Sequence, residues 1–146
     1  MAVIINGIDN NQTVTISLAS LANGGVATSS SIDNSSNRYL NADVQVKMRT
    51  GTSVSSTGTV CLMFLKSSDG GVTFDDADES NASVLKTFIA NASTTDYILS
   101  ADTGRQGGLL AEFFKISILN ETGSAFDSSS ANFSVKFVGK KIRTEP

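Results

Sequence analysis

The stretch Leu40-Asn41-Ala42-Asp43-Val44-Gln45-Val46-Lys47-Met48-Arg49 decides the fold class. Every even-numbered position in it is apolar, and every odd-numbered position is polar. Successive side chains of a β-strand point to opposite faces of a sheet, so this alternation places one face in a core and the other in solvent. The stretch therefore predicts a half-buried β-strand.

The rest of the chain repeats this pattern in short pieces. Alternation recurs at 13–18, 114–118 and 133–137, and weaker strand candidates lie at 3–5, 26–32, 84–89 and 97–99. Polar, glycine-containing turns separate these pieces, and the one short segment with helical character is 107–112. Many short strands joined by polar turns predict an all-β, antiparallel sandwich or barrel of eight or nine strands. The 146 residues fit a single domain over 1–146, with residues 1–12 as a candidate N-terminal arm.

One run differs from the others because it does not alternate. Val60-Cys61-Leu62-Met63-Phe64-Leu65 is continuously apolar, which predicts a strand covered on both faces. The cover is either a second layer of the same chain or a neighbouring subunit. Cys61 is the chain's one cysteine, and its apolar surroundings favour a small buried hydrophobe over a reactive thiol.

The composition excludes several classes of protein. The chain has no histidine, which removes the commonest general base and the imidazole ligands of catalytic zinc sites. The net charge of −3 predicts no field for nucleic acid, and no apolar run approaches the length of a membrane span. The N-terminus lacks the features of a signal peptide, and a single cysteine fits synthesis in a reducing cytosol. We expect no cofactor and no enzymatic activity.

The densest group of charges lies in residues 69–79. Carboxylates of this segment are a candidate Ca²⁺ site, since Ca²⁺ prefers oxygen ligands, and the candidates are Asp69, Asp75, Asp76 and Asp78. Their spacing does not fit an EF-hand loop, and the alternative is a solvated loop between strands. A glycosidase that uses Asp75 and Asp76 is a weaker hypothesis, because no aromatic platform for a sugar stands nearby.

Two further groups are candidates for contact with a partner. Arg38 and Tyr39 open the alternating stretch and belong to residue types favoured at the centres of interfaces; the alternative for Tyr39 is a strand-start aromatic with its hydroxyl in water. A basic group near the C-terminus could contact nucleic acid or an acidic partner, but it fits a charged edge strand and tail better; it comprises Lys136, Lys140, Lys141 and Arg143.

Three segments together resemble small virion proteins of tailed bacteriophages. Residues 31–44 read Ser-Ile-Asp-Asn-Ser-Ser-Asn-Arg-Tyr-Leu-Asn-Ala-Asp-Val, which is similar to a recurring segment of those proteins. Residues 67–74 (Ser-Ser-Asp-Gly-Gly-Val-Thr-Phe) and 119–126 (Leu-Asn-Glu-Thr-Gly-Ser-Ala-Phe) are similar to two later segments, in the same order. The three cover about a quarter of the chain, and none of them is a catalytic motif.

The resemblance implies a structural component of a phage particle, made in the bacterial cytoplasm and located in the virion. The first expectation is a decoration or cement protein on the outside of the capsid, with a jelly-roll-like sandwich, a trimeric state, and the major capsid protein or another virion protein as its partner. The second places the protein in the tail or the head–tail connection. A third hypothesis from a different class is a carbohydrate- or receptor-binding module, which should expose aromatic side chains near its loop tips, with Phe74, Tyr97 and Phe126 as candidates.

Overall fold

The computed structural model describes residues 3–80, 82–106 and 110–145, and this part of the chain is built almost entirely of strands. The nine strands found in it are β1 (Val3–Thr13), β2 (Val26–Thr28), β3 (Ile32–Asp33), β4 (Asn41–Arg49), β5 (Thr59–Ser67), β6 (Ser83–Ile89), β7 (Asp96–Asp102), β8 (Phe113–Glu121) and β9 (Ser134–Glu145). Two short 3₁₀ turns complete the list, η1 (Thr103–Gln106) and η2 (Ser130–Asn132). No helix in the described part is long and apolar enough to cross a membrane.

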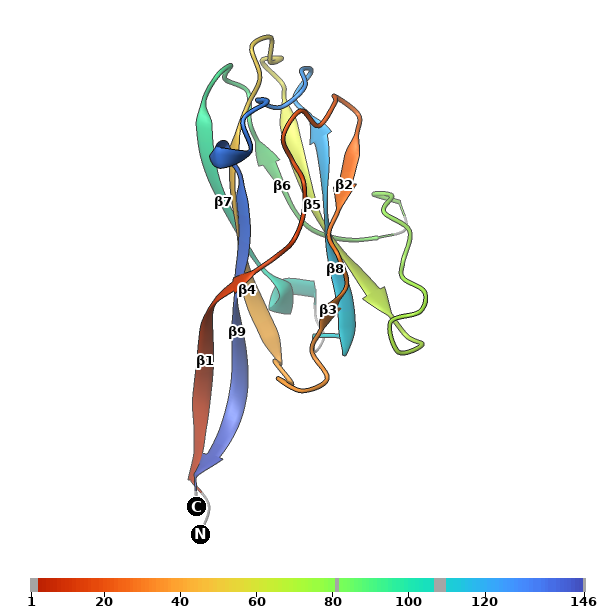
Figure 1. Ribbon diagram of the computed structural model, residues 1–146, viewed down its shortest axis with the longest axis vertical. Coiled ribbons are helices and arrows are strands. Elements are labelled where there is room, and N and C mark those ends of the chain that lie inside the picture. The colour runs from red at the N-terminus through yellow and green to blue at the C-terminus, as the bar shows by residue number, and fades with distance from the viewer. Residues whose placement is uncertain (1–2, 81, 107–109, 146) are drawn as a thin grey trace.

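The strands form two antiparallel sheets packed face to face (Figure 1). Sheet A has the order β1-β9-β4-β7, and sheet B has the order β2-β8-β5-β6, with β3 added beside β8. The antiparallel pairs β1·β9, β2·β8, β4·β7 and β5·β6 are nested along the chain, and consecutive pairs are placed in alternate sheets. This wrapping of nested pairs is the jelly-roll arrangement. The prediction of an all-β, jelly-roll-like sandwich is confirmed.

The core lies between the sheets and is filled by the alternating residues of the best sequence pattern. Val44, Val46 and Met48 of β4 are at most 1% exposed, and they face Ile116 and Ile118 of β8 across the sandwich layer. Burying such side chains contributes about 1.5 to 3 kcal/mol each relative to leaving them in water. The polar partners of the same strand stay at the surface of sheet A, so the alternation does decide the orientation of β4.

The continuously apolar strand β5 is buried on both faces by this chain alone. Val60 and Leu62 point into the core, while Cys61, Met63 and Leu65 lie on the other face and are at most 2% exposed. The sequence left open whether the outer face of this strand is covered by a second layer of the same chain or by a neighbouring subunit. In the structure the loop that joins β5 to β6 covers this face.

Three local expectations are wrong. The segment 13–18 is extended but mostly outside the ladders, because the chain crosses there from sheet A to sheet B; Val14 and Leu18 are buried all the same. The candidate strand 26–32 is split into β2 and β3. The expected helical turn at 107–112 lies partly outside the described residues, its described part is not helical, and a 3₁₀ turn occurs just before it at η1.

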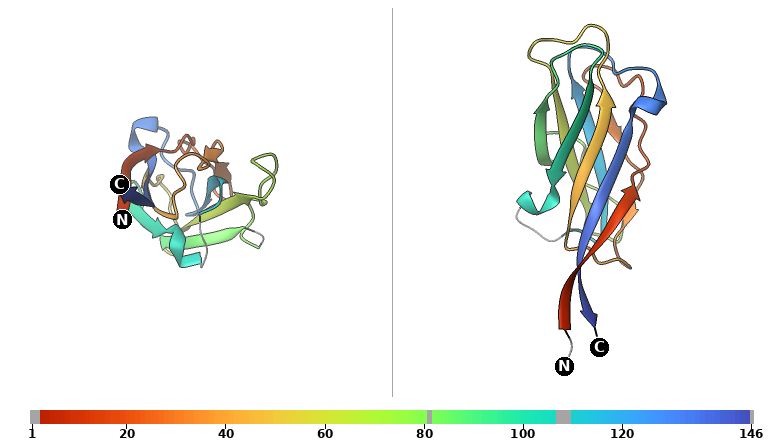
Figure 2. Two further views of the ribbon diagram at one scale, coloured as in Figure 1. Left: turned by 90° about the horizontal axis from the view of Figure 1, so that it is seen from below. Right: turned by 90° about the vertical axis from the view of Figure 1, so that its left-hand side faces the viewer.

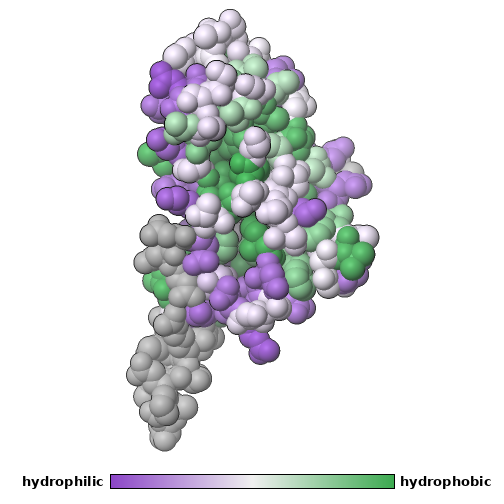
Figure 3. Space-filling view, in the orientation of Figure 1, coloured by the Kyte–Doolittle hydropathy of each residue, from purple (hydrophilic) through white to green (hydrophobic). Residues whose placement is uncertain are grey.

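Apolar residues show through along the seam between the two sheets when the molecule is seen as in Figure 1, with hydrophilic residues on both flanks (Figure 3). The large apolar side chains that are exposed in the described part of the chain come from separate elements: Ile8, Val26, Val72, Ile89 and Ile98. Single exposed apolar residues are normal on protein surfaces. Among these residues, Ile8 is of interest for contact with a partner because it lies where two strands leave the sandwich.

Candidate functional site

Two strands project from the sandwich together and form a ribbon. β1 and β9 pair without a shift from Val3↔Glu145 to Asp9↔Gly139, and a bulge follows between Asp9 and Gln12. β4 accompanies β9 only as far as the pair Asn41↔Lys140. Beyond this pair, residues 3–7 and 141–145 form a two-stranded ribbon that extends past the end of the sandwich, and the two ends of the chain lie at its tip (Figures 1 and 2).

A cleft lies at the base of the ribbon. Its volume is about 270 Å³, and it is lined by Gly7, Ile8, Leu40, Asn41, Lys140 and Lys141. Ile8 is 57% exposed, so an apolar side chain borders a basic rim. The Oδ1 atom of Asn41 is buried and finds no hydrogen-bond partner among the described residues. The base of the ribbon therefore combines exposed apolar surface, a buried acceptor and positive charge.

Lys140 belongs to a small ionic group on the outer face of sheet A. Its Nζ lies 2.9 Å from a carboxylate oxygen of Asp43 and 3.7 Å from one of Asp102. The hydrogen bond to Asp43 raises the pKa of the lysine, and the charges of both carboxylates act in the same direction. All three side chains are more than one third exposed, so these pairs orient the lysine more than they stabilise the fold.

The structure separates the two predicted contact residues. Tyr39 is only 4% exposed, and its ring meets that of Phe137 edge to face with 5.9 Å between centroids. A Cβ atom on Gly139 would lie 2.5 Å from the Tyr39 ring, so this position has room for glycine alone. Arg38 is exposed with φ of 53°, and it lines a second cleft of about 350 Å³. Of the two, Arg38 is the residue whose side chain can reach a partner.

Asn34 holds the turn that presents Arg38. Its Oδ1 accepts a hydrogen bond from the Tyr39 N–H at 2.8 Å, and its Nδ2 donates to the Tyr39 carbonyl at 3.0 Å and to the Ala111 carbonyl at 3.3 Å. The amide side chain thus pairs with both backbone groups of Tyr39. This accounts for the polar run before the strand in structural terms, because Asn34 is 4% exposed and its amide is fully used inside the turn.

The second cleft mixes polar and apolar walls. It is lined by Asn34, Ser35, Arg38, Tyr39, Leu40, Leu110 and Glu112. Leu40 also lines the cleft at the base of the ribbon, so the two hollows meet at the start of β4. The structure places them at the end of the sandwich from which the ribbon projects.

The acidic candidates are not brought together into a metal site. Asp69 accepts hydrogen bonds from the Thr73 hydroxyl and from the backbone N–H groups of Val72 and Thr73. These bonds, with the Thr73 hydroxyl as the largest cause, lower the pKa of Asp69 to about 2. Among the described residues, no group of three or more carboxylate or thiol side chains is placed to hold a metal ion.

The other acidic candidates lie at different places in the same loop between β5 and β6. Asp75 accepts from the Lys66 N–H at 3.0 Å, and its own N–H donates to the Lys66 carbonyl at 3.0 Å. Asp78 accepts from the Ser80 N–H, which lowers its pKa. Asp76 is exposed. The carboxylates shape the loop between β5 and β6, which the sequence allowed as the alternative to calcium.

This loop is the cover of β5. Gly71 lies against the Phe113 ring, and Lys115 places its Nζ 4.3 Å from the centroid of the Phe74 ring. Further along, Cys61 lies buried on this face. Burial is the largest cause that raises the pKa of the Cys61 thiol to about 12, and Glu79 is the next. A thiol with that pKa is not a nucleophile at neutral pH.

The basic group near the C-terminus lies on β9, and β9 is an inner strand of sheet A. For Lys136 and Lys140 the interpretation as a charged edge strand is wrong, because each pairs with β1 on one side and β4 on the other. Lys141 and Arg143 lie beyond the last pair with β4, where β9 is one of the two edges of the ribbon. The edge strand of this sheet carries few charges, as its sequence from Val3 to Thr13 shows.

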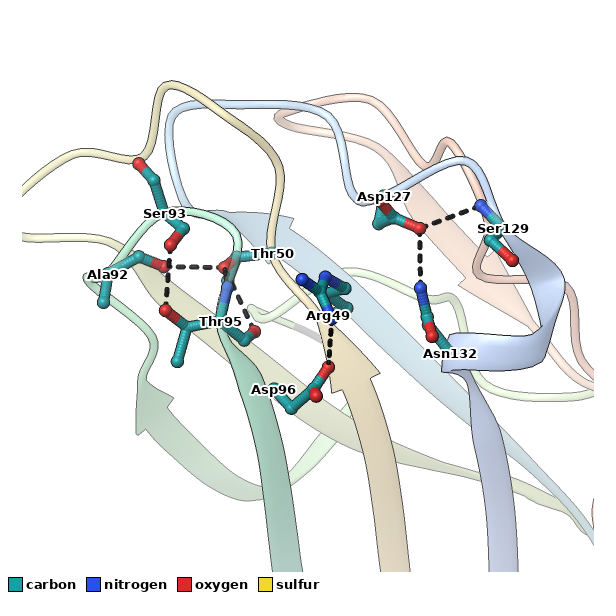
Figure 4. A network of polar contacts seen from close by, with 9 residues as sticks. All are labelled: Arg49, Thr50, Ala92, Ser93, Thr95, Asp96, Asp127, Ser129 and Asn132. Atoms are coloured by element: carbon teal, nitrogen blue, oxygen red, sulfur yellow. Dashed lines mark hydrogen bonds and ion pairs between the residues drawn. The ribbon is translucent and has the colours of Figure 1, made fainter.

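At the opposite end of the sandwich, polar contacts hold the loops in place, and these are called the pinned loops (Figure 4). The Thr50 hydroxyl donates to the Ala92 carbonyl at 2.6 Å and accepts from the Thr95 N–H at 3.0 Å. Nearby, Asp127 accepts from the Ser129 N–H and from Asn132, which lowers its pKa. These contacts bind the loops to one another.

The aromatic residues expected at loop tips do not form an exposed platform. Phe126 is 3% exposed, Phe74 is half-buried beside Lys115, and the half-buried Tyr97 uses its hydroxyl to accept from the Ala92 N–H at 3.1 Å. Stacking on a sugar needs an open ring face. None of the three candidates offers one without movement of its neighbours.

No family model matches the chain, and no curated protein matches it in sequence. Among solved structures, a family 35 carbohydrate-binding module from an environmental isolate shares 13% identity over 97% of this chain and 93% of its own, with a TM-score of 0.44. A second such module, Xyl-CBM35 in complex with a disaccharide containing glucuronic acid, shares 13% identity over 99% of this chain and 90% of its own, with a TM-score of 0.33. Likeness at this level carries no argument about function, which must rest on the geometry of this chain.

Sequence reasoning missed half of the ribbon. The predicted arm covered residues 1–12; residues 1–2 lie outside the described residues, and the structure pairs Val3 to Asp9 and Gln12 with β9. A signal was present, because apolar and β-branched residues at both ends of the chain, Val3 to Ile5 and Ile142 to Thr144, could pair with each other. The cleft residues Ile8 and Asn41 carry no motif that could have revealed them.

Proposed function

We propose that this chain is a non-catalytic structural protein of a bacteriophage particle, a decoration protein that binds the outside of the assembled capsid. The ribbon of β1 and β9 is the observation that carries this proposal. It projects from a sandwich whose loops are pinned and whose sheet B is covered by the chain's own loop. A projecting strand pair is suited to reach a neighbouring protein, since strands bind partners through their backbone groups.

The clefts at the base of the ribbon support the same role. Exposed Ile8 is an apolar group that a partner would cover. Arg38, at the adjoining cleft, offers a residue type common at interface centres. Contact at this end of the molecule would leave the pinned loops at the far end facing outward.

A decoration protein acts by mass action. It binds the closed shell and not its dissociated subunits, so its binding free energy is added to the stability of the shell. Many copies on one lattice hold firmly even where each single contact is weak. The jelly roll needs neither a cofactor nor a metal for this role.

The test uses capsids of the phage that encodes the chain, prepared without this protein. The purified chain should bind them in a fixed number of copies per shell and raise the temperature at which they open. A variant without residues 1–6 and 142–146 should bind at least tenfold more weakly, which is about 1.4 kcal/mol. Equal binding by this variant would remove the ribbon from the proposal, and binding to isolated tails instead of heads would move the protein to the tail or the connector.

The cleft beside Arg38 favours a second candidate, a carbohydrate-binding module. Its volume is about 350 Å³, and Ser35, Arg38 and Glu112 give hydrogen-bonding groups beside apolar Leu40 and Leu110. A glycan array would test this function. Binding that is lost in Arg38→Ala but kept in Lys47→Ala, an exposed cation on sheet A, would support it over the virion role.

A further inference from the structure

The edge of sheet A is open to strand pairing. β1 is the edge strand, and its segment Val3-Ile4-Ile5-Asn6-Gly7-Ile8 contains neither a charged residue nor a proline. Edge strands present backbone N–H and C=O groups to other chains, and most proteins protect them with lysines, prolines or short lengths. The other edge of this sheet, β7, is different, because it begins at Asp96 and ends at Asp102.

Within the described residues, the ribbon also has no third strand beside it. It lies beyond the last pair of β4 with β9, and Figure 2 shows it extending past the sandwich. A two-stranded ribbon alone is marginally stable in water. An additional strand on the β1 edge would give it the third strand that independent stability requires.

We propose that this third strand is β1 of a second copy of the same chain, paired antiparallel about a two-fold axis at Asn6. The regular part of β1 runs from Val3 to Asp9, before the bulge, and Asn6 is its central residue. Antiparallel pairing about that centre uses every residue of the regular part in both copies. A contact of this kind is isologous and closes as a dimer.

The resulting register is chemically compatible. Ile8 lies opposite Ile4 of the second copy, and Asp9 lies opposite its Val3, so no like charges meet across the pair. The exposed side chain of Ile8, at 57%, gains an apolar neighbour. The two four-stranded sheets become one continuous sheet, with the two sandwiches at its ends.

Solution mass tests the proposal, with two isoleucines as a matched pair. Ile8 and Ile98 are 57% and 67% exposed and lie on the two edge strands of sheet A. By light scattering at micromolar concentration, the full chain should be a dimer, Ile8→Lys a monomer, and Ile98→Lys a dimer. A monomeric full chain, a trimer that Ile8→Lys leaves intact, or a dimer lost only in Ile98→Lys would each overturn the proposal.

A cross-link tests the register itself. In a Cys61→Ala background, Asn6→Cys should form an interchain disulfide under mild oxidation, because residues directly opposite in antiparallel strands bring their Cβ atoms within about 5.5 Å. Ser36→Cys, exposed in the turn before β4, is the control and should stay reduced. Cross-linking at both positions or at neither would overturn pairing at Asn6. These assays need no capsid, so their outcome is independent of the proposed virion role.

Discussion

The side chain of Asn34 takes the place of the backbone hydrogen bonds that a neighbouring strand would make. Its amide pairs with the N–H and the carbonyl of Tyr39, as a neighbouring strand would, and so fixes the point at which the chain enters β4. The Asp33 carboxylate closes the same turn by accepting from the Ser35 N–H. The Ser35 side chain, followed by this backbone bond, lowers the pKa of Asp33. Tyr39 is then held over Gly139, inside the core.

Replacing Asn34 by alanine should therefore cost far more than its position in a polar loop suggests. The variant leaves the buried N–H of Tyr39 without an acceptor, and an unsatisfied buried group costs about 1 to 3 kcal/mol. We expect a loss of about 2 to 4 kcal/mol in the free energy of unfolding, measured in urea. Asn37→Ala, exposed in the same turn, should change it by less than about 0.5 kcal/mol. Equal effects would show that the amide contacts do not stabilise the turn.

The three segments 31–44, 67–74 and 119–126 each use a polar side chain in this way. In residues 119–126, Asn120 is fully buried, and its amide donates to the carbonyls of Leu21 and Ser124 while it accepts from Thr122. In residues 67–74, Asp69 closes the turn. Each segment has a polar side chain that binds backbone groups. In this chain, the three segments on which the resemblance rests therefore each contain a turn closed by a polar side chain.

At the scale of elements, the loop from β5 to β6 acts as a third layer over sheet B. Val72 is 79% exposed, whereas Phe74, two residues later, is half-buried beside Lys115. This contrast shows which loop residues form the cover. Cys61 lies under it and serves as a probe of its opening.

Cys61 should react with a maleimide in the native protein only when this cover opens. Phe74→Ala removes the ring from Lys115 and should speed labelling at least several-fold at pH 7.5, with little change in global stability. Val72→Ala should leave the rate unchanged, since that side chain lies in solvent. Rates that follow only the global free energy of unfolding would show that the cover and the sandwich open together.

The same loop should give the protein part of its acid sensitivity. The folded pKa of Asp69 is about 2, below the ordinary value of 3.8, so its contribution to stability is present above about pH 4 and is lost as the pH falls towards 2. Asp69→Ala should flatten the dependence of stability on pH in this window, measured by urea unfolding. A carboxyl resonance of Asp69 that titrates near 3.8 in NMR would contradict the assignment.

The elements that could be predicted are those with a face in the core. Alternation located β4 and the centres of β8 and β9, because one face of each is buried by the opposite sheet. It failed at residues 13–18, where the burial alternates but the chain passes between sheets and finds few ladder partners. Tyr39 could not be placed from sequence, since its burial depends on Gly139, a hundred residues away.

At the scale of the whole molecule, the strand order was beyond sequence reasoning for the same reason. Nesting of β1 with β9 and of β2 with β8 joins residues from opposite ends of the chain, and local alternation carries no information about such pairs. The single charge of β1, on Asp9, and the basic residues of β9 could be interpreted only once β1 was placed at an edge of sheet A. The function proposed here depends on this long-range pairing.

The last prediction separates the sandwich from its ribbon. The apolar core residues lie between Val14 and Phe137, so a chain without residues 1–6 and 142–146 retains the core. We expect it to unfold cooperatively in urea, with near-UV circular dichroism like that of the full chain and a midpoint that is little changed. It should be monomeric, because residues 3–6 and with them the centre of the proposed self-pairing at Asn6 are removed. Loss of cooperative unfolding would mean that the ribbon holds the sandwich together, and its open edge would then be part of the fold and not a surface reserved for a second copy.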